Sequence, residues 1–297
     1  MSQNIWCVNL KAQPTTAQFC IARGIVGIGW GIDPPPTSAP DYLRRSKVKY
    51  GNISWTTATN ILLKRMNVDD LVWTRTSNAT YYLGRVTSDW RSENDQDFRD
   101  ADTRNVRDCD WITAGSIDEV PGRVLNNFRR GRTAQQVKSR NVNRYSRFFF
   151  NQKKGENIYP LDPDTTTDIF DLLDPDDFED VVGIYLQLEK RLLIYPSTCK
   201  RDTKHIEFIL VSREGTDHFG VQVKAEKTSL LNHDNYRNDS DKAFLFSASG
   251  EIQGSANDMT EIIPADVIRK FIFSHRDVMP RRIQAWIKYV KTCVRED

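Results

Sequence analysis

The sequence predicts a chain of two modules, an α+β module followed by an α/β module. The chain has 297 residues, which exceeds the length at which a single hydrophobic core usually stops growing. Its charge is divided, because residues 1–150 hold 22 Lys and Arg against 14 Asp and Glu, whereas residues 151–297 hold 20 against 26. Six of the seven tryptophans also lie in the first half. Such a split favours two modules, the first of which could meet a polyanion.

The composition narrows the class of protein. With 39% hydrophobic and 28% charged residues, we expect a globular chain with a real core. No apolar run approaches the ~18–20 residues of a membrane span, and the N-terminus lacks the pattern of a secretory signal. The cysteines are odd in number and far apart, which disfavours a disulfide scaffold or a CxxC zinc site and fits a reducing cytosol: Cys7, Cys20, Cys109, Cys199 and Cys293. Four scattered histidines disfavour a His-based zinc enzyme.

The sharpest boundary signal is a reversal of charge. Residues 120–154 contain ten basic residues and no acid, and residues 155–188 contain ten acids and no base. The second stretch is also rich in Pro, Asp and Thr, which is typical of loops and helix starts. We therefore predict a first module over 1–155, an acidic linker over 156–175 and a second module over 176–297.

The first module is predicted to open as strand, helix and strand on a small curved sheet. Residues 5–10 form a short apolar strand, and Thr15 with Gln18 has the spacing of a capping box that begins a helix. Gly24 would end that helix. Residues 24–31 then read as a buried strand whose glycines allow close backbone approach.

Turn and capping patterns predict the rest of this module. Residues 70–75 and 81–87 alternate in polarity and are separated by a turn, so we expect a hairpin, followed by a strand over 105–112. A short helix is predicted after residues 116–119, with Gly131 as its end. Thr133 and Gln136 have the spacing of a second capping box, which predicts another helix from that point.

The second module is predicted to be a compact α/β domain. Asp174 and its neighbours have helix-start chemistry, and an amphipathic helix follows from Phe178. The later elements are predicted in this order: strands over 191–195, 206–212, 219–224 and 242–247, and helices over 266–273 and 281–294.

One strand of this module carries a pattern suited to catalysis. Side chains alternate between the faces of a strand, so Gln222 and Lys224 share the face opposite Val221. Residues 206–212 form an apolar strand with one acid, Glu207, and residues 213–218 can serve as the turn between the two strands. Pairing them places Glu207 near Gln222 and Lys224.

This trio suits Mg²⁺-assisted hydrolysis of a phosphodiester. A hard cation takes oxygen ligands from carboxylates, amides, backbone carbonyls, water and phosphate. A nearby lysine can stabilise developing negative charge and orient the attacking water. The alternative is that the Gln-x-Lys side chains lie on a solvent-exposed strand face and have no catalytic role.

In these residues the chain resembles the PD-(D/E)XK nucleases, specifically the Mrr-type restriction endonucleases, over roughly 170–280. The pair Phe178-Glu179 opens the first helix, and Gln222-Val223-Lys224 matches the Q-x-K triplet of that branch. The resemblance implies metal binding by Glu207, Gln222 and the Val223 carbonyl, catalysis by Lys224 and an accessory role for Glu179. The central acid of the family is usually an Asp beside glycines, which this chain lacks, so Asp202 is the alternative to Glu207.

The first module is similar to the PUA-like superfamily, particularly its EVE and YTH members. The matching segments are Trp6 in the first strand, residues 24–31 with Trp30, and residues 52–55, 68–73 and 81–86. The resemblance implies a pocket that holds a nucleobase, often a modified one, between aromatic walls. Trp30 and Trp55 are the candidate walls, whereas Trp6 and Trp73 fall within apolar strands and are expected in the core.

The acid-free basic stretch is the candidate for phosphate contacts. Its members are Arg123, Arg129, Arg130, Arg132, Lys138, Arg140, Arg144 and Arg147. The alternative is that the acidic segment after it neutralises these charges within the protein.

Together these inferences predict a modification-dependent DNA endonuclease that requires Mg²⁺ or Mn²⁺. The resemblance implies restriction of foreign double-stranded DNA in a prokaryotic cytoplasm, without a membrane partner. Cutting both strands requires two active sites, so a homodimer is expected. The alternatives are a reader of modified nucleic acid whose second module is inactive, and an enzyme directed at RNA.

Overall fold

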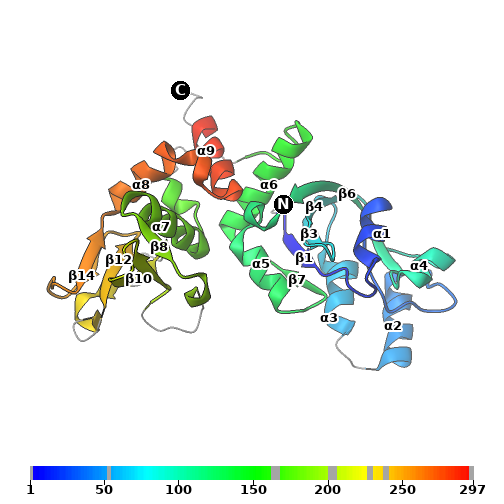
Figure 1. The fold of residues 1–297 in the computed structure, drawn as a ribbon. Helices are drawn as coiled ribbons and strands as arrows, with labels where there is room; N and C mark the ends of the chain where they lie inside the picture. The colour runs from blue at the N-terminus through cyan, green and yellow to red at the C-terminus, as the bar shows by residue number, and fades with distance from the viewer. Residues whose placement is uncertain are drawn as a thin grey trace. The chain divides into compact units, whose positions relative to one another are not determined.

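The computed structural model describes residues 3–51, 55–161, 168–199, 206–225, 230–236 and 241–293. The chain forms two compact units, Met1–Asp162 (unit 1) and Pro163–Asp297 (unit 2). Both units combine helices with a sheet (Figure 1), so the protein is of the α+β class. Among the described helices, none has both the length and the apolar character needed to span a bilayer.

A curved sheet lies at the centre of unit 1. Its described strands run in the order β2-β6-β4-β3-β1-β7, and β5 pairs with β6. β6 pairs with β2 through its first four residues and with β4 through the remainder, so one long strand carries the sheet around its bend. The strands are β1 (Ile5–Val8), β2 (Ile25–Ile28), β3 (Leu71–Arg75), β4 (Tyr81–Val86), β5 (Arg91–Ser92), β6 (Asn105–Gly115) and β7 (Ala134–Gln136).

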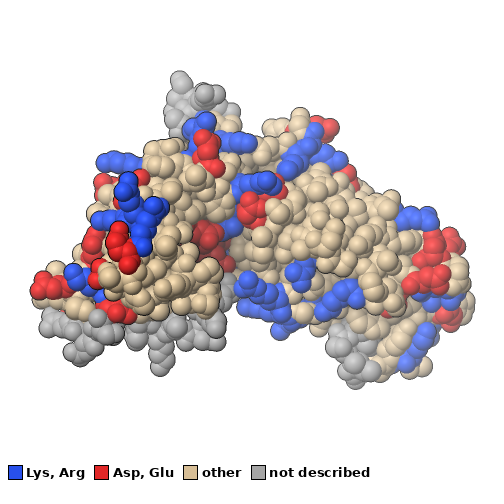
Figure 2. Space-filling view, in the orientation of Figure 1, with Lys and Arg blue, Asp and Glu red and all other residues tan. Residues whose placement is uncertain are grey.

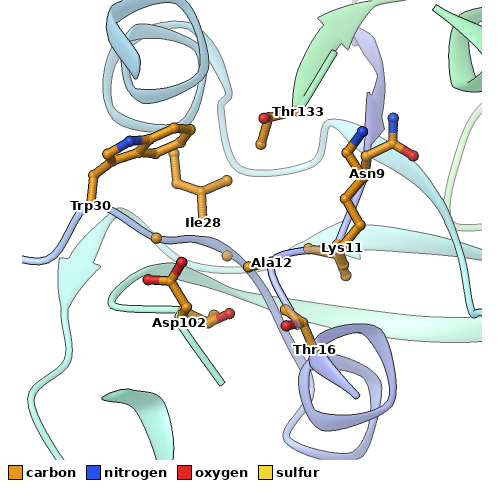
Figure 3. A pocket seen from close by; sticks show the side chains of 12 residues that line it. Asn9, Lys11, Ala12, Thr16, Ile28, Trp30, Asp102 and Thr133 are labelled. Atoms are coloured by element: carbon orange, nitrogen blue, oxygen red, sulfur yellow. The ribbon is translucent and has the colours of Figure 1, made fainter. Parts of the chain in front are cut away.

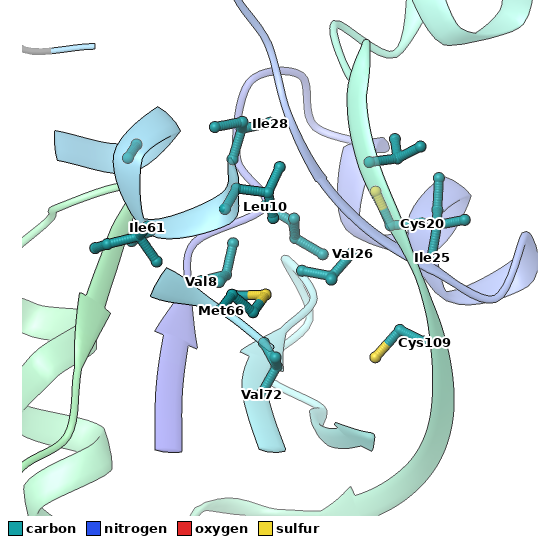
Figure 4. Close-up of a cluster of buried hydrophobic side chains, with 14 of the residues drawn as sticks. Val8, Leu10, Cys20, Ile25, Val26, Ile28, Ile61, Met66, Val72 and Cys109 are labelled. Carbon is teal, nitrogen blue, oxygen red and sulfur yellow. The ribbon is translucent and has the colours of Figure 1, made fainter. Parts of the chain in front are cut away.

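Helices cover both faces of this sheet, which explains why β1 and β2 are apolar at every position. They are α1 (Thr16–Ala22), α2 (Ala39–Tyr50), α3 (Trp55–Asn60), the π-helix η1 (Ile61–Arg65), α4 (Gln96–Asp100), the 3₁₀ turn η2 (Ile117–Glu119), α5 (Gly122–Arg129) and α6 (Arg140–Lys154). On one face, the core packs Val8, Val26 and Val72 against Ile61 of η1 (Figure 4). On the other face, Trp73 donates to the Ser146 hydroxyl of α6 at 2.9 Å.

The structure places Trp6 and Trp73 in the core, as the sequence predicts. They are 1% and 0% exposed. The Trp6 indole N–H donates to Asp70 Oδ2 at 2.7 Å, so burial leaves its one polar group satisfied. Neither ring can stack on a ligand.

One predicted helix start in unit 1 is wrong. Thr133 and Gln136 do not begin a helix, because the residues between them form β7 and pair with β1. Pairing to a sheet edge satisfies these backbone groups better than an isolated cap would, and the helix begins only at Arg140, capped by Ser139. The helix predicted from Thr15 is present as α1, with Thr15 as its N-cap residue. The side-chain capping bond is absent, and the Thr16 hydroxyl instead accepts from the Gln13 N–H at 2.8 Å.

The structure also revises the residues between the strands of unit 1. The helix predicted after residues 116–119 is α5, which follows Pro121 and ends before Gly131. Residues 117–119 form the additional turn η2, because Pro121 stands between the two with extended ψ. Trp55, expected in a loop, is the first residue of α3. The helix α2 was not anticipated, because its hydrophobic positions are few and it begins at a Ser38 cap directly after a proline-rich loop.

A mixed five-stranded sheet forms the centre of unit 2, in the order β14-β12-β10-β9-β8 among the described strands. β8, β9 and β10 form an antiparallel meander, whereas β10, β12 and β14 run parallel. These strands are β8 (Leu192–Ile194), β9 (Phe208–Ser212), β10 (His218–Lys224), β12 (Lys242–Ser247) and β14 (Thr260–Ile263); β11 (Leu231–Asn232) pairs with β13 (Ile252–Gln253) apart from them.

Helix α7 covers one face of this sheet, where Phe178 packs on Phe246 with ring centroids 5.8 Å apart. Leu231 and Tyr236 cover the opposite face at β12. The remaining elements of unit 2 are η3 (Ile169–Asp171), α7 (Pro175–Glu189), η4 (Pro196–Thr198), η5 (His233–Tyr236), α8 (Ala265–Ser274), η6 (Arg276–Val278) and α9 (Arg281–Cys293). α7 begins with the capping box of Asp174 and Asp177, as its helix-start chemistry predicts.

Candidate nucleic-acid interface and candidate active site

Unit 1 contains a pocket between the ends of β1 and β2, here called the β1–β2 pocket. Its volume is about 260 Å³, which is below the range typical of drug-sized ligands and suits a small planar group. The lining residues come from four loops around the sheet (Figure 3): Asn9, Leu10, Lys11, Ala12, Thr16, Gly27, Ile28, Gly29, Trp30, Asp102, Thr103 and Thr133.

Trp30 forms one wall of this pocket and is held in an unusual conformation. Its φ is 61°, a left-handed value that is a genuine outlier for a bulky residue and costs on the order of 1–3 kcal/mol. Its carbonyl accepts the Tyr42 hydroxyl at 2.9 Å, and the Asn105 amide lies at 3.4 Å, so surrounding groups fix the strained backbone. The indole is half-buried, which leaves part of its face available to a ligand.

Gly27 of β2 and Gly29 directly after it determine how closely the segment with Asp102 and Thr103 approaches this part of the pocket. A Cβ on Gly27 would collide with the Thr103 side chain, and a Cβ on Gly29 would stand 2.6 Å from Oδ1 of Asp102. Only glycine therefore allows the segment before β6 to lie against β2. The prediction of close backbone approach in this strand is confirmed.

Exposed cations stand at the rim of the β1–β2 pocket. Lys11 donates to the Gly131 carbonyl at 2.9 Å, and the Asn9 amide donates to the Arg132 carbonyl at 2.8 Å. These bonds hold the turn between α5 and β7 beside the pocket residue Thr133. Arg129, Arg130 and Arg132 of this turn are exposed and make no ion pair with any described residue. Lysine and arginine side chains gather over this part of unit 1 (Figure 2).

The remaining members of the basic stretch lie on other parts of unit 1. Arg140 and Arg147 of α6 line a separate cavity of about 670 Å³ with Asn143 and Gln3. Arg140 is exposed, whereas Arg144 and Arg147 are half-buried. Lys138 and Arg123 are exposed, outside the α5–β7 turn. The contiguous basic run is thus divided between two surfaces of unit 1.

Trp55, the second candidate wall, is placed in α3, and its side chain lies outside the described residues. The sequence reasoning missed three pocket residues that the structure brings beside Trp30: Lys11, Asp102 and Thr133. All three stand in connecting segments. The pairing of β1 with β7 brings Lys11 and Thr133 together, and the approach to Gly29 places Asp102 beside them.

In unit 2, the structure brings Glu207 and Gln222 into contact. Gln222 Nε2 donates to Glu207 Oε1 at 2.6 Å and lies 3.5 Å from the Val223 carbonyl oxygen. The strands place them there because Glu207 N donates to the Val221 carbonyl at 2.7 Å, directly before β9. Gln222 is only 2% exposed, whereas Glu207 is half-buried at the sheet edge.

Lys224 ends β10 and is half-buried. It stands beside Ser247 of the parallel strand β12, so the three residues lie where these two strands end. The carboxyl edge of parallel strands is the place where α/β folds bind ligands.

Glu179 belongs to α7 and not to the strands that carry Glu207 and Gln222. Glu179 is half-buried, one residue after Phe178 in α7. Burial and then the charges of Glu179 and Asp180 raise the pKa of the Cys199 thiol, so Glu179 lies toward the segment after η4. Asp202, the alternative metal ligand, lies outside the described residues.

The Gln222 contact tests whether these residues suit a hard cation. The neutral amide N–H group donates toward two oxygens, those of Glu207 and of the Val223 backbone. A cation could bind these two oxygens if the amide turned its own oxygen toward it. One carboxylate with neutral oxygens fits Mg²⁺, which keeps waters and shares phosphate ligands. No cluster of three or more His, Cys, Asp or Glu side chains exists among the described residues, so the donor set has low charge.

The described cysteines are free thiols, with Cys7, Cys20 and Cys109 buried and Cys199 exposed. Burial raises the pKa of Cys20 to about 12 and that of Cys109 well above its ordinary value. Thiols of such high pKa are poor nucleophiles.

Comparison with known proteins gives one match. The model of a family described as a domain of unknown function (DUF8426) matches residues 6–137, which span the sheet of unit 1 from β1 to β7 but less than half of the chain. No curated protein and no solved structure matches the chain.

Proposed function

We propose that the protein is a metal-dependent DNA endonuclease in which unit 1 holds an extruded, modified base and unit 2 cuts the backbone. The single observation that carries the catalytic part is the contact of Glu207 with buried Gln222 at the end of β10, with Lys224 two residues further along the same strand. Unit 2 would be a PD-(D/E)XK-like domain, and unit 1 a PUA-like domain.

The order of elements in unit 2 supports this proposal. α7 is followed by the meander β8-β9-β10 and then by the parallel strand β12, which is the arrangement that the resemblance implies. Glu207, the Gln222 side-chain oxygen and the Val223 carbonyl would hold Mg²⁺ or Mn²⁺. When bound, the cation supplies positive charge that activates water and neutralises the phosphate.

The chain's own residues would perform the remaining tasks. The Lys224 ammonium, at the strand end, stabilises the negative charge that develops on the phosphate and orients the attacking water. Burial restricts the Gln222 side chain, and its amide would turn its oxygen toward the cation in place of the nitrogen that faces Glu207. Glu179 would assist from α7.

The β1–β2 pocket and its cationic rim support the reading part. An aromatic wall at Trp30 can stack a base, which is worth about 1–3 kcal/mol. Extruding a base from a duplex costs a few kcal/mol, and contacts from Lys11 and the arginines of the α5–β7 turn to the flanking phosphates can offset this cost. Cutting both strands requires two active sites, so we propose a homodimer acting on double-stranded DNA in a prokaryotic cytoplasm.

A cleavage assay tests the proposal. Supercoiled DNA, with and without modified bases, is incubated with the full chain in Mg²⁺ or in EDTA. We expect Mg²⁺-dependent cutting of the modified DNA, and loss of cutting by at least about 100-fold in Glu207→Gln. The matched control is Glu214→Gln, because Glu214 is an exposed acid on the β9–β10 turn of the same hairpin.

Three results would contradict parts of the proposal. Binding of modified DNA without cleavage under any metal would favour a reader with an inactive second unit. Preferential competition by RNA would favour an RNA-directed protein. Equal cleavage by Glu207→Gln and the control would remove Glu207 from the active site.

A further inference from the structure

We propose that the β1–β2 pocket takes bases that carry an exocyclic amino group, and that Asp102 recognises this group. The inference rests on the proposed reading of a base by unit 1, and it adds the chemical class of that base. Cytosine, adenine and guanine, with derivatives that keep an amino N–H, belong to this class, whereas thymine and uracil do not.

Asp102 is exposed and presents its carboxylate at the wall of the pocket. Its Oδ1 lies 2.6 Å from the point where a Cβ on Gly29 would stand, so the acid rests against the backbone beside Trp30 (Figure 3). No donor in the described part of the chain bonds this carboxylate. The hydroxyls of Thr16 and Thr103, which also line the pocket, both donate to the Ala101 carbonyl.

The backbone at this position accepts an acid. Asp102 follows α4 and its C-cap Ala101, with φ 46°. A left-handed residue directly after a helix is usually Gly or Asn, and Asp is also enriched in this conformation. The backbone therefore holds Asp102 at the wall of the pocket in a conformation that this residue type adopts.

The charges at the pocket limit the kind of group that the Asp102 carboxylate can bind. Lys11 lines the pocket and bonds the α5–β7 turn, whose arginines are exposed, so backbone phosphates are expected on that side, and a carboxylate would repel them. A carboxylate accepts hydrogen bonds only. The amino groups of cytosine, adenine and guanine donate, whereas the matching edge of thymine presents oxygen acceptors beside its single N–H. Asp102 therefore favours a base with an amino group.

Binding to single-stranded DNA tests the assignment, because no extrusion cost enters. The probe is an oligothymidine in which one central position is cytosine, adenine, guanine, thymine or an abasic site, titrated with the full chain in EDTA. We expect the chain to bind the amino-bearing bases roughly 5–150-fold more tightly than thymine.

Asp102→Asn isolates the carboxylate. Its amide both donates and accepts, so the affinities for the amino-bearing bases and for thymine should become nearly equal, while the melting temperature stays equal or rises because Asn suits the left-handed position. Gly29→Ala is a second variant: its methyl group must displace the carboxylate, and the same preference should fall with Asp102 still present.

The outcomes separate this inference from the proposed function. Equal binding of the abasic probe and all bases would overturn base reading and the Asp102 assignment together. Binding that requires a base and weakens in Trp30→Ala, but is equal for thymine and the amino-bearing bases, would overturn only the assignment. Full preference retained in a folded Asp102→Asn would overturn it as well.

Discussion

At the scale of single residues, the two candidate sites position their side chains in opposite ways. Trp30 is exposed to a ligand by a strained backbone that its neighbours hold. Gln222 is instead fully buried and is positioned by two regular strands. The strained backbone at Trp30 lowers the stability of the fold, whereas the position of Gln222 depends on the rigidity of the sheet. Substitutions at the two positions should therefore differ in their effects.

Trp30→Ala should weaken binding of DNA that contains the preferred base by roughly 5–150-fold, because one stacking wall is lost. Binding of the abasic probe should stay unchanged. A titration with both probes and a melting curve check this. If the melting temperature falls sharply and both affinities are lost, Trp30 serves the core and the pocket is misplaced.

Lys224→Ala should reduce cleavage by about 100-fold or more without weakening DNA binding comparably, because the ammonium acts on charge that develops during the reaction. The matched control is Lys242→Ala, since Lys242 stands at the opposite end of the same strand pair, beside Phe219. Single-turnover rates measure the effect. Equal rates in the two variants would exclude a catalytic role for Lys224.

At the scale of elements, the α5–β7 turn is the part of the basic stretch that the structure associates with the pocket. The hydrogen bonds from Lys11 and Asn9 fix the turn through its backbone carbonyls. The arginine side chains of the turn are therefore left exposed to solvent. The arginines of α6 lie along a different cavity. Phosphate contacts near the base should therefore depend on the turn.

Changing Arg129, Arg130 and Arg132 together to Glu should weaken binding to all DNA sequences alike. The slope of log affinity against log salt should flatten by about 2–3. The control variant changes Lys270, Lys288 and Lys291, exposed on α8 and α9, to Glu with the same change in net charge. Affinity measured over a salt series decides, and similar losses in both variants would mean that only net charge matters.

At the scale of the whole molecule, part of the predicted acidic linker belongs to unit 1. Tyr159 is 1% exposed, its hydroxyl donates to the Asp69 carbonyl at 3.0 Å, and Asn151 bonds its backbone on both sides. The division between the units falls between residues 162 and 163, after this anchor. A fragment that keeps Tyr159 should therefore be the independent folding unit.

The fragment 1–162 should fold and bind DNA alone, whereas the fragment 1–155 should be less stable by about 3–5 kcal/mol, because it loses a buried aromatic ring. Tyr159→Ala in the longer fragment should reproduce most of the difference. Thermal and urea unfolding measure it. Equal stability of the two fragments would show that Tyr159 does not anchor unit 1.

The sequence by itself determined the elements whose patterns are local. The β3–β4 hairpin, the strands β8, β9, β10 and β12 and the helix that starts at the acidic box are all recoverable, because alternation and capping act within a few residues. Strand β14 was not predicted. The strand pattern also predicted the proximity of Glu207 to Gln222, since a short hairpin joins their strands.

Only the tertiary structure decided the features that depend on distant partners. Residues 134–136 form β7 because the edge of β1, more than 120 residues earlier, offers backbone partners. The same pairing brings Lys11, Thr133 and the arginine turn to Trp30, and the close approach to Gly29 brings Asp102 there. No local pattern encodes such contacts, because their free energy arises only when the sheet is assembled.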